Sequence, residues 1–450
     1  MPPSSPAPLD DVPVSRILAS WWPLAASWLL MAAESPALTA VVARLPDPEI
    51  HLAAYGGVVF PISLIIEAPV IMLLAASTAL CRDWNSYIKI RRFMMAAGAF
   101  LTSVHILLAF TPLYDWITVS LLSVPAEIIE PARLGLKIMT PWTWSIAYRR
   151  FHQGVMIRFG YSRLVGYGTV LRLSTILMVL LAGYQSHRLP GIAVGSSAIA
   201  AGVIAEAIYA GFAIRPILRD DLVSAKSLPE RLTLRIFLAF YAPLVMTSLL
   251  SLLANPLGSA AISRLPMALS SLAAWPVVSG LIFLLRSAGL ALNEVVVALL
   301  DEKCSSRNLI RFTSWLSAGT TIMLLIILLS PLALLWFEKV SALSPALASL
   351  ATRATWLALP LPALSVLQSW FQGAILHGKR TGGISESVVI YLAVSGLALG
   401  GGVLYGKIPG LYIGVAAITL STLAQTAWLG VRSCGIIHQV RRRDADCGVP

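Results

Sequence analysis

Long apolar stretches, separated by short polar segments, run along almost the whole chain. Most of them are about 20 residues or longer, the length that a helix needs to cross a hydrocarbon layer of about 30 Å. The pattern predicts twelve membrane-spanning helices. We place them at residues 16–42, 52–80, 93–113, 131–157, 164–184, 191–214, 232–256, 271–300, 312–336, 350–376, 384–406 and 410–432.

Composition and charge support this prediction. Of the 450 residues, 57% are hydrophobic and 12% are charged, whereas soluble domains carry about 25% charged residues. The net charge of +12 does not indicate a nucleic-acid partner, because the basic residues are concentrated in alternate loops. If the N-terminus is inside, 23 Lys and Arg residues fall inside, seven outside and three within spans. We therefore expect a multi-pass protein of the cell (plasma or inner) membrane with both termini in the cytoplasm.

The sequence also repeats itself. An offset in residue number of 220, which becomes 219 after a single-residue deletion, aligns the first half of the chain with the second. The matched segments include Pro23-Leu24 with Pro243-Leu244, "RLP" at 44–46 with "RLP" at 264–266, "LAAY" at 52–55 with "LAAW" at 272–275, and Gln153-Gly154 with Gln372-Gly373. Six spans per half is an even number, so both halves enter the membrane in the same direction, as in transporters built from parallel repeats.

The predicted fold is therefore an all-α membrane protein with two pseudo-symmetric six-helix bundles. Its expected parts are a disordered cytoplasmic tail (1–15), an N-terminal lobe (16–214), a cytoplasmic linker (215–231), a C-terminal lobe (232–432) and a second cytoplasmic tail (433–450).

Several short motifs carry a family resemblance. They are "WWPL" at 21–24, "LAAYG" at 52–56, a basic hairpin after the second span, and "FHQG" at 151–154 with "WFQG" at 370–373. With two six-span lobes, the chain resembles the multidrug and toxic compound extrusion (MATE) transporters of the multidrug/oligosaccharidyl-lipid/polysaccharide flippase superfamily. It is most similar to the progressive ankylosis-like branch. The resemblance implies a V-shaped pair of bundles around a cavity lined by spans 1, 2, 7 and 8, and export of small anions, drugs or lipid-linked sugars.

Charged residues within spans are the main candidates for function, because each costs about 2.5–3.5 kcal/mol at the bilayer centre on insertion scales. Glu67 in span 2 and Arg286 in span 8 fall at nearly one depth on related helices of opposite lobes. We expect them to face each other across the cavity, either as a latch between the lobes or as a site for substrate or coupling ion. Pro69 and Pro61 are predicted to kink the helix beside Glu67.

The other candidates are less specific. Arg172 and Glu206 lie at one depth on consecutive helices, which predicts a structural ion pair, with a proton relay as the alternative. Asn293 and Glu294 follow Arg286 by two helical turns and line the cavity or pack on a neighbour. Two residues that precede prolines at related places in spans 1 and 7 line the outward mouth or cap a helix end; they are Glu34 and Asn255.

These features favour an ion-coupled secondary transporter, an exporter of a small solute, working by alternating access of two lobes. Arg286 suits an anion and the glutamates suit a cation, so the cargo stays open. Coupling to H⁺ or Na⁺ is expected, with Glu67 as the leading titratable group and no other cofactor. A lipid-linked saccharide flippase of the same fold is the alternative. The partners are the lipid bilayer and a small-molecule or lipid-linked substrate, and a monomer is consistent with this pattern.

Other function classes are disfavoured. The chain has no Walker A motif, no HExxH motif and no paired aspartates in its spans, so we do not expect an enzyme or an ATP-driven pump. The four cysteines form no metal-binding motif, and in this topology they face the reducing cytoplasm, so we expect free thiols. They are Cys81, Cys304, Cys434 and Cys447.

Overall fold

The computed structural model describes residues 12–225, 232–300, 302, 304–378 and 382–444, and its regular structure there is helical throughout. The first half contains α1 (Val14–Ala32), α2 (Glu34–Val42), α3 (Pro48–Ala54), η1 (Tyr55–Val59), α4 (Phe60–Ile71), α5 (Leu73–Leu80), α6 (Trp84–Phe110), α7 (Leu113–Asp115), η2 (Trp116–Leu121), α8 (Ala126–Arg158), α9 (Ser162–Ser186), α10 (Gly191–Ile217) and η3 (Leu218–Leu222). The second half contains α11 (Leu234–Ser263), α12 (Ala268–Leu290), α13 (Leu292–Leu299), α14 (Ser306–Leu329), α15 (Leu332–Leu334), η4 (Leu335–Val340), α16 (Pro345–Leu357), α17 (Leu361–His377), α18 (Gly382–Tyr405) and α19 (Gly410–Arg443). The elements named η are π-helical.

Most of these helices are long and apolar enough to cross a membrane. Within the described ranges ten candidate spans pass that test, or eleven if the bent pair α16 and α17 forms one span. The helix α8, which is 33 residues long and carries seven charged residues, does not pass. Counting α8 as a span brings the total to the twelve that the sequence predicts. The predicted multi-pass, all-helical fold is confirmed.

The internal repeat is visible in the backbone. Residues other than glycine rarely adopt a positive φ. Each half has a residue with positive φ at three matching turns, and five of these six residues are not glycine. The pairs are Asp47 with Met267, Ser123 with Ala342, and His187 with Gly406. In residue number the members of these pairs differ by 220, 219 and 219, the offsets already found in the sequence. The two halves therefore fold in the same way.

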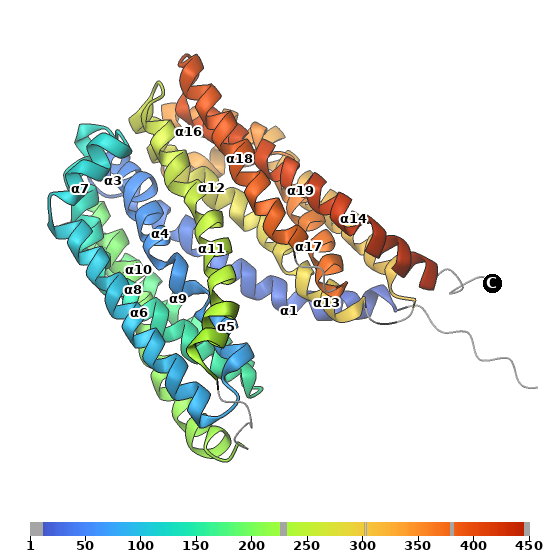
Figure 1. The fold of residues 1–450 in the computed structure, drawn as a ribbon. Coiled ribbons are helices and arrows are strands. Elements are labelled where there is room, and N and C mark those ends of the chain that lie inside the picture. The colour runs from blue at the N-terminus through green and yellow to red at the C-terminus, as the bar shows by residue number, and fades with distance from the viewer. Residues whose placement is uncertain (1–11, 226–231, 301, 303, 379–381, 445–450) are drawn as a thin grey trace, which may run out of the picture.

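The two halves form two bundles, which we call the N lobe (residues 14–222) and the C lobe (residues 234–443). The bundles lie close together near α3 and α12 and spread apart toward the opposite end (Figure 1). At the narrow end, which we call the closed end, the equivalent residues Gly56 and Pro276 meet. A Cβ atom on Gly56 would come within 2.6 Å of Pro276 Cδ, so glycine is what permits this approach. The opposite end is the open end.

The first helix of each lobe packs partly on the other lobe, and α1 can be followed across the gap in Figure 1. On α1, the Trp21 indole donates a hydrogen bond of 2.9 Å to the carbonyl of Ala288 in the C lobe. On α11, the Tyr241 hydroxyl donates to the carbonyl of Pro69 in the N lobe. The offset of 220 relates Trp21 to Tyr241, so the two side chains are equivalent in the repeat. The exchange of first helices is thus reciprocal.

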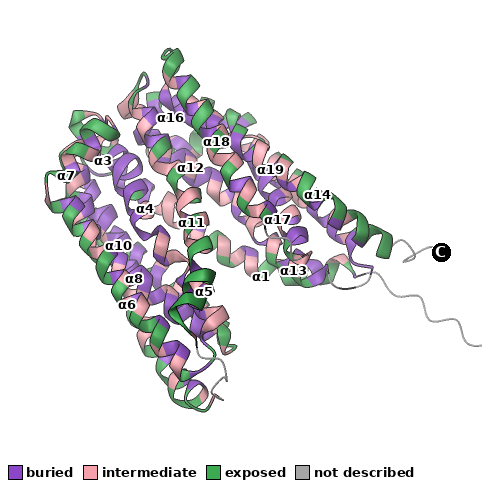
Figure 2. Ribbon diagram, in the orientation of Figure 1, coloured by how far each residue is buried: buried purple, intermediate pink, exposed green. Residues whose placement is uncertain are grey.

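The outer faces of both bundles are apolar. Figure 2 shows exposed residues along the outside of the lobes and buried residues within each bundle. Large apolar side chains are among the exposed ones, such as Phe100, Leu397 and Leu404, which are 65%, 77% and 90% exposed. Such surfaces are expected where the neighbour is lipid and not water.

Some sequence expectations concern boundaries and cysteines. The helix α19 continues to Arg443, beyond the predicted span end at 432, and the first part of the predicted linker 215–231 is helical through η3. The domain limits themselves remain predictions, and residues 1–11, 226–231 and 445–450 lie outside the described residues. The expectation of free thiols is wrong for Cys304, which is disulfide-bonded, whereas Cys81 and Cys434 are free.

Candidate functional site

A cavity of 530 Å³ lies between the lobes, lined by side chains of both. Its walls come largely from spans 1, 2, 7 and 8, as the resemblance implied, through residues such as Glu34, Tyr55, Asn255 and Trp275. Spans 5, 6, 10 and 12 add the rest of the wall: Arg172, Ile199, Leu361, Val415 and Ile418. Most of these side chains are apolar, so the few polar groups decide what the cavity binds.

Arg286 on α12 is the basic group that the C lobe brings to this cavity. It is half-buried, and its Nε donates a hydrogen bond of 2.5 Å to Ser365 Oγ on α17. No carboxylate of the described residues lies within 4.0 Å of its guanidinium, whereas the buried Arg149 and Arg172 have such partners. A charge in an apolar wall without a counter-ion is costly. Arg286 therefore presents an uncompensated positive charge to the cavity.

The N lobe holds a buried ionic network instead. Arg172 Nη2 on α9 lies 2.5 Å from Glu34 Oε1, and Arg172 Nη1 lies 3.6 Å from Glu206 Oε2 on α10. Arg149 on α8 donates a hydrogen bond of 2.8 Å to the same Glu206 Oε2, and Gln153 donates to Glu206 Oε1. The side chain of Glu206 is 1% exposed and that of Glu34 is 19% exposed. The two arginines and two glutamates balance, and Glu34 is the carboxylate that borders the cavity.

Glu67 lies beside this network and not beside Arg286. It is buried in α4, and the basic side chains that act on it electrostatically are Arg149, Arg150 and Arg172 of its own lobe. Its Oε2 atom has no hydrogen-bond partner among the described residues. The expected meeting of Glu67 and Arg286 across the cavity is not present, because Glu67 is absent from the residues that line it.

The repeat explains why this expectation is wrong. At the offset of 220, the equivalent of Glu67 is Ser287, and the equivalent of Arg286 is Ile66. Successive helix residues point about 100° apart at 3.6 residues per turn. Ser287 is fully buried in its own lobe, and Glu67 is turned into its lobe in the same way. Although Glu67 and Arg286 fall at nearly the same depth, their side chains therefore do not both face the cavity.

The remaining predicted site residues separate into two groups. Pro61 lines the cavity, and span 2 is interrupted at Met72, three residues after Pro69, where α4 ends and α5 begins. Asn293 and Glu294 on α13 do not line the cavity: Glu294 is exposed, and Asn293 Oδ1 is buried without a hydrogen-bond partner in the described structure.

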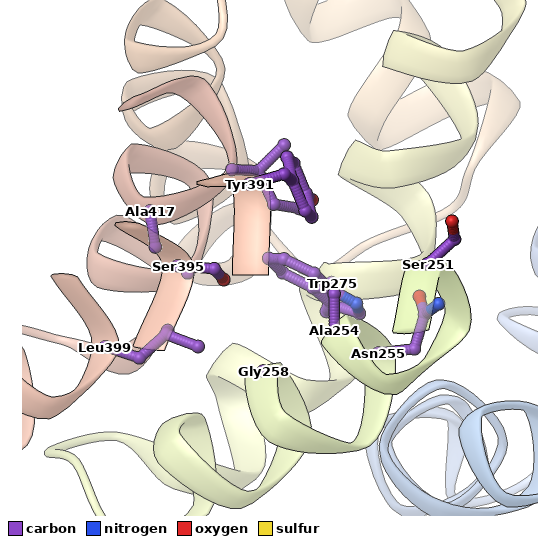
Figure 3. Close-up of a pocket in the computed structure, with 11 residues that line it drawn as sticks. Ser251, Ala254, Asn255, Gly258, Trp275, Tyr391, Ser395, Leu399 and Ala417 are labelled. Atoms are coloured by element: carbon purple, nitrogen blue, oxygen red, sulfur yellow. The ribbon is translucent and has the colours of Figure 1, made fainter. Parts of the chain in front are cut away.

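Asn255 connects the cavity to a small chamber of 70 Å³ inside the C lobe. Figure 3 shows Tyr391 and Ser395 of α18 facing Trp275 across this chamber, with Asn255 and Ser251 on the side of α11. Tyr391 is the repeat equivalent of Arg172, at an offset of 219. The C lobe therefore has neutral hydroxyl and amide groups where the N lobe has an ion pair.

Arg149 is the functional candidate that the sequence analysis missed. It is one of the 23 basic residues assigned to the inner side, but it is 4% exposed and lies within α8. The signal that could have identified it is its repeat equivalent, Gln368, because a neutral residue at that place in an apolar span marks a buried position.

Comparison with known proteins identifies the fold. No family model and no curated protein matches the chain in sequence. A multidrug resistance MATE family transporter of the MOP superfamily, in an inward-facing conformation, aligns with 94% of this chain and 99% of its own, with 14% identity and a TM-score of 0.69. The chain has the MATE transporter fold. An outward-facing structure of such a transporter aligns with 94% of this chain and 96% of its own, at 15% identity and a TM-score of 0.57.

A further MATE-fold neighbour is a MOP superfamily transporter from Pyrococcus furiosus. It has 16% identity and a TM-score of 0.60, covers 95% of this chain and 99% of its own, and is described as having a binding pocket of reverse polarity that suggests a different function. Pocket polarity therefore differs between proteins of this fold, so the cargo must be argued from the residues of each chain.

Proposed function

We propose that this protein is a secondary active transporter of the cell membrane that exports a small organic anion by alternating access of its two lobes. The observation that carries the proposal is Arg286, a guanidinium in the wall of a largely apolar cavity that has no carboxylate partner among the described residues. An anionic group of the cargo supplies the missing counter-charge. The cavity volume of 530 Å³ lies within the range of about 300–1,000 Å³ that small-molecule sites occupy.

Two observations support alternating access. The lobes have the same fold and meet in close contact at one end, where Gly56 and Pro276 touch, and they diverge at the other. Structures of this fold exist in inward-facing and outward-facing forms, and the TM-score with the inward-facing form is higher. The positive-inside rule assigns the open end to the cytoplasm, so we infer that this arrangement is the inward-facing one.

We infer that the coupling ion is a proton and that Glu34 is the first group to receive it. Glu34 borders the cavity and pairs with Arg172, and Arg149 lies nearby. Two fixed guanidinium charges beside this carboxylate disfavour Na⁺, whereas a proton only neutralises Glu34 and breaks its ion pair. Because Glu34 begins α2 directly after the break at Ala33, losing that pair frees the joint between α1 and α2. Glu67, deeper in the lobe, is the second candidate.

The progressive ankylosis-like branch agrees with an anionic cargo, and we propose it as the nearest branch. The alternative is a lipid-linked saccharide flippase. The same assay tests both, because a flippase moves a headgroup that remains attached to lipid, whereas an exporter releases a free solute.

The decisive experiment uses proteoliposomes with an imposed pH gradient and a panel of small carboxylates and phosphate esters. We expect that at least one anion dissipates the gradient with wild-type protein and that Arg286→Gln abolishes this flux. Arg133→Gln, which removes an arginine that pairs with Asp115 of its own lobe, is the matched control for loss of an arginine. Flux that is equal in wild type and Arg286→Gln would remove Arg286 from the mechanism. Movement of a lipid-linked saccharide alone would favour the flippase.

A further inference from the structure

The "RLP" motif that occurs once in each half has no role in the cavity, yet it joins the two lobes. Arg44, at the end of α2, donates hydrogen bonds of 2.9 Å to the carbonyl of Val340 and 2.5 Å to that of Lys339. Both acceptors lie at the end of η4 in the C lobe. The same guanidinium also donates to the carbonyl of Ala40 on its own helix at 2.6 Å, which fixes its direction.

Arg264, at the end of α11, makes the reverse connection. It donates hydrogen bonds of 2.7 Å to the carbonyl of Leu121 and 3.4 Å to that of Leu122, at the end of η2 in the N lobe. It also donates to the carbonyl of Ala260 on its own helix at 2.7 Å. The offset of 220 relates Ala40 to Ala260, just as it relates Arg44 to Arg264. Of the cross-lobe acceptors, Leu121 is equivalent to Val340 at the offset of 219, whereas Leu122 and Lys339 lie on opposite sides of that position. The two sets of contacts therefore correspond in the donor, the acceptor on its own helix and one acceptor of the other lobe.

The acceptors suit an arginine for a general reason. The last carbonyls of a helix have no partner within it and carry the negative end of its dipole. The planar guanidinium presents a fixed fork of donors that can bind two such oxygens at once, whereas the donors of a lysine ammonium have no such fixed arrangement. After η2 and η4 the chain turns at a residue with positive φ, Ser123 and Ala342 respectively. The free carbonyls therefore lie at equivalent turns of the two lobes.

We propose that Arg44 and Arg264 form a reciprocal latch that holds the closed end shut and sets the ratio of the two lobe arrangements. This inference rests on the proposed alternating access. Each arginine lies on one lobe and its acceptors on the other, so both sets of bonds must break when the lobes separate at this end. Both side chains are exposed at the rim, where water can replace the lost bonds. The latch can therefore open in every cycle.

The test measures the distance between the lobes directly. Arg188 and Lys407 are exposed residues at equivalent places in the two lobes, in the turns before α10 and α19 at the closed end. Each is replaced by cysteine and spin-labelled in a Cys434→Ser background. Cys81, the other free cysteine of the described residues, is buried. Double electron–electron resonance on the purified full chain in nanodiscs then reports the two populations.

We expect Arg44→Gln and Arg264→Gln to raise the population with the longer distance by similar factors, each up to about tenfold, because each removes charged hydrogen bonds from one arrangement only. The population with the longer distance should be larger in the double variant than in either single variant. In Arg44→Lys that population should lie between those of wild type and Arg44→Gln. Arg133→Gln is the matched control, because Arg133 lies at the same end but pairs with Asp115 of its own lobe. It should leave the distances unchanged.

Unchanged distances in the double variant, with thermal stability retained, would overturn the latch. An equal shift in Arg133→Gln would also overturn it, since any lost charge at this end would then suffice. Failure of the proposed function looks different. A chain that moves no anion but still shows the arginine-dependent shift keeps the latch and loses the transport proposal.

Discussion

The two lobes share one backbone design but differ in the chemistry of their interiors. In the N lobe, Arg149 and Glu206 form a buried hydrogen-bonded ion pair at 2.8 Å. At the equivalent positions of the C lobe, given by the offset of 219, Gln368 donates a hydrogen bond of 3.0 Å to Gln425. The geometry of the pair is kept and its charge is removed. Packing alone therefore does not require ions at this place.

This difference suggests a division of labour. A buried ion pair gives little net stability over a neutral one, because removing two charges from water costs about as much as their attraction returns. The N lobe has this ion pair despite its cost, and its carboxylates can take up and release protons. The C lobe is neutral at the same place and shows the cavity one uncompensated cation, Arg286. We infer that the N lobe couples to the ion and the C lobe selects the cargo.

The largest expected effect comes from removing the carboxylate of the buried ion pair while its arginine remains. Glu206→Gln leaves Arg149 without its carboxylate and should destabilise the protein by about 3–5 kcal/mol. The double variant Arg149→Gln/Glu206→Gln copies the C lobe and leaves Arg172 paired with Glu34, so it should recover most of the loss. Thermal unfolding in detergent measures both. The matched variant in the other lobe, Gln425→Ala, should cost only about 1–3 kcal/mol. Equal losses in the two lobes would contradict the comparison.

The next effect concerns cargo. Arg286→Gln should weaken binding of the transported anion about tenfold or more, the loss that follows when one charged hydrogen bond is removed. Its fold should be retained, because the variant removes an uncompensated charge. Arg172→Gln, which leaves Glu34 without its arginine partner, should lower thermal stability instead. Anion-dependent shifts in melting temperature separate the two outcomes, and a Tm loss in Arg286→Gln as large as that in Arg172→Gln would refute the assignment.

A smaller effect distinguishes the two candidate proton sites. Glu34→Gln should reduce flux driven by a pH gradient about tenfold, less than the roughly 10²–10⁴-fold that a proton-transfer group contributes to a catalysed reaction. Glu67→Gln should reduce it less, because Glu67 does not border the cavity. Counterflow without a pH gradient should be less affected in both variants. A larger loss of flux in Glu67→Gln than in Glu34→Gln would instead make Glu67 the leading candidate for the proton site.

The smallest effect lies outside the membrane, where the lobes cap equivalent helices differently. In the N lobe Asp83 caps α6 locally by accepting from Ser86 N at 2.8 Å. In the C lobe α14 is capped by Asp444, which follows α19 and accepts from the backbone N–H groups of Cys304 and Ser306 at 3.1 and 3.0 Å. Burial acts to raise the pKa of Asp444, but hydrogen bonds from Arg443 and Ser306 outweigh it and lower that pKa to about 2.

A carboxylate whose pKa is lowered by folding stabilises the protein above its unfolded pKa and stops doing so as the pH falls through the folded value. Asp444→Asn should therefore reduce stability by about 1 kcal/mol at neutral pH. The difference from wild type should shrink between about pH 4 and pH 2. Unfolding midpoints of both proteins across this range provide the check, and a difference that grows in acid would contradict it.

The sequence predicted the architecture well because its signals are long-range and redundant. Span length and the repeat were enough for the fold, and the matched positive-φ turns at Asp47 and Met267 show how closely the halves agree. Which side chains meet could not be predicted in the same way. Glu67 and Arg286 share a depth, but one residue in register turns a side chain by about 100°. Arg149 was counted with the basic residues of the inner side, although it falls within the predicted span 131–157 and within α8, which ends at Arg158.

The cross-lobe contacts show a second limit. The "RLP" repeat was visible, but nothing in a linear sequence says that Arg44 reaches carbonyls near residue 340 and not its own lobe. Backbone acceptors carry no sequence signature, so contacts of this kind appear only once the lobes are placed together.

The exchange of first helices also bears on how the chain is made. Trp21 finds its hydrogen-bond acceptor at Ala288, 267 residues further along, and Ile17 is fully buried in a cluster formed mostly by the C lobe. A ribosome that has released only the N-terminal half leaves α1 without its docking surface. The first transmembrane helix of this protein can therefore dock only after the C lobe has been synthesised. Until then the insertion machinery or the surrounding lipid must cover the surface of that helix.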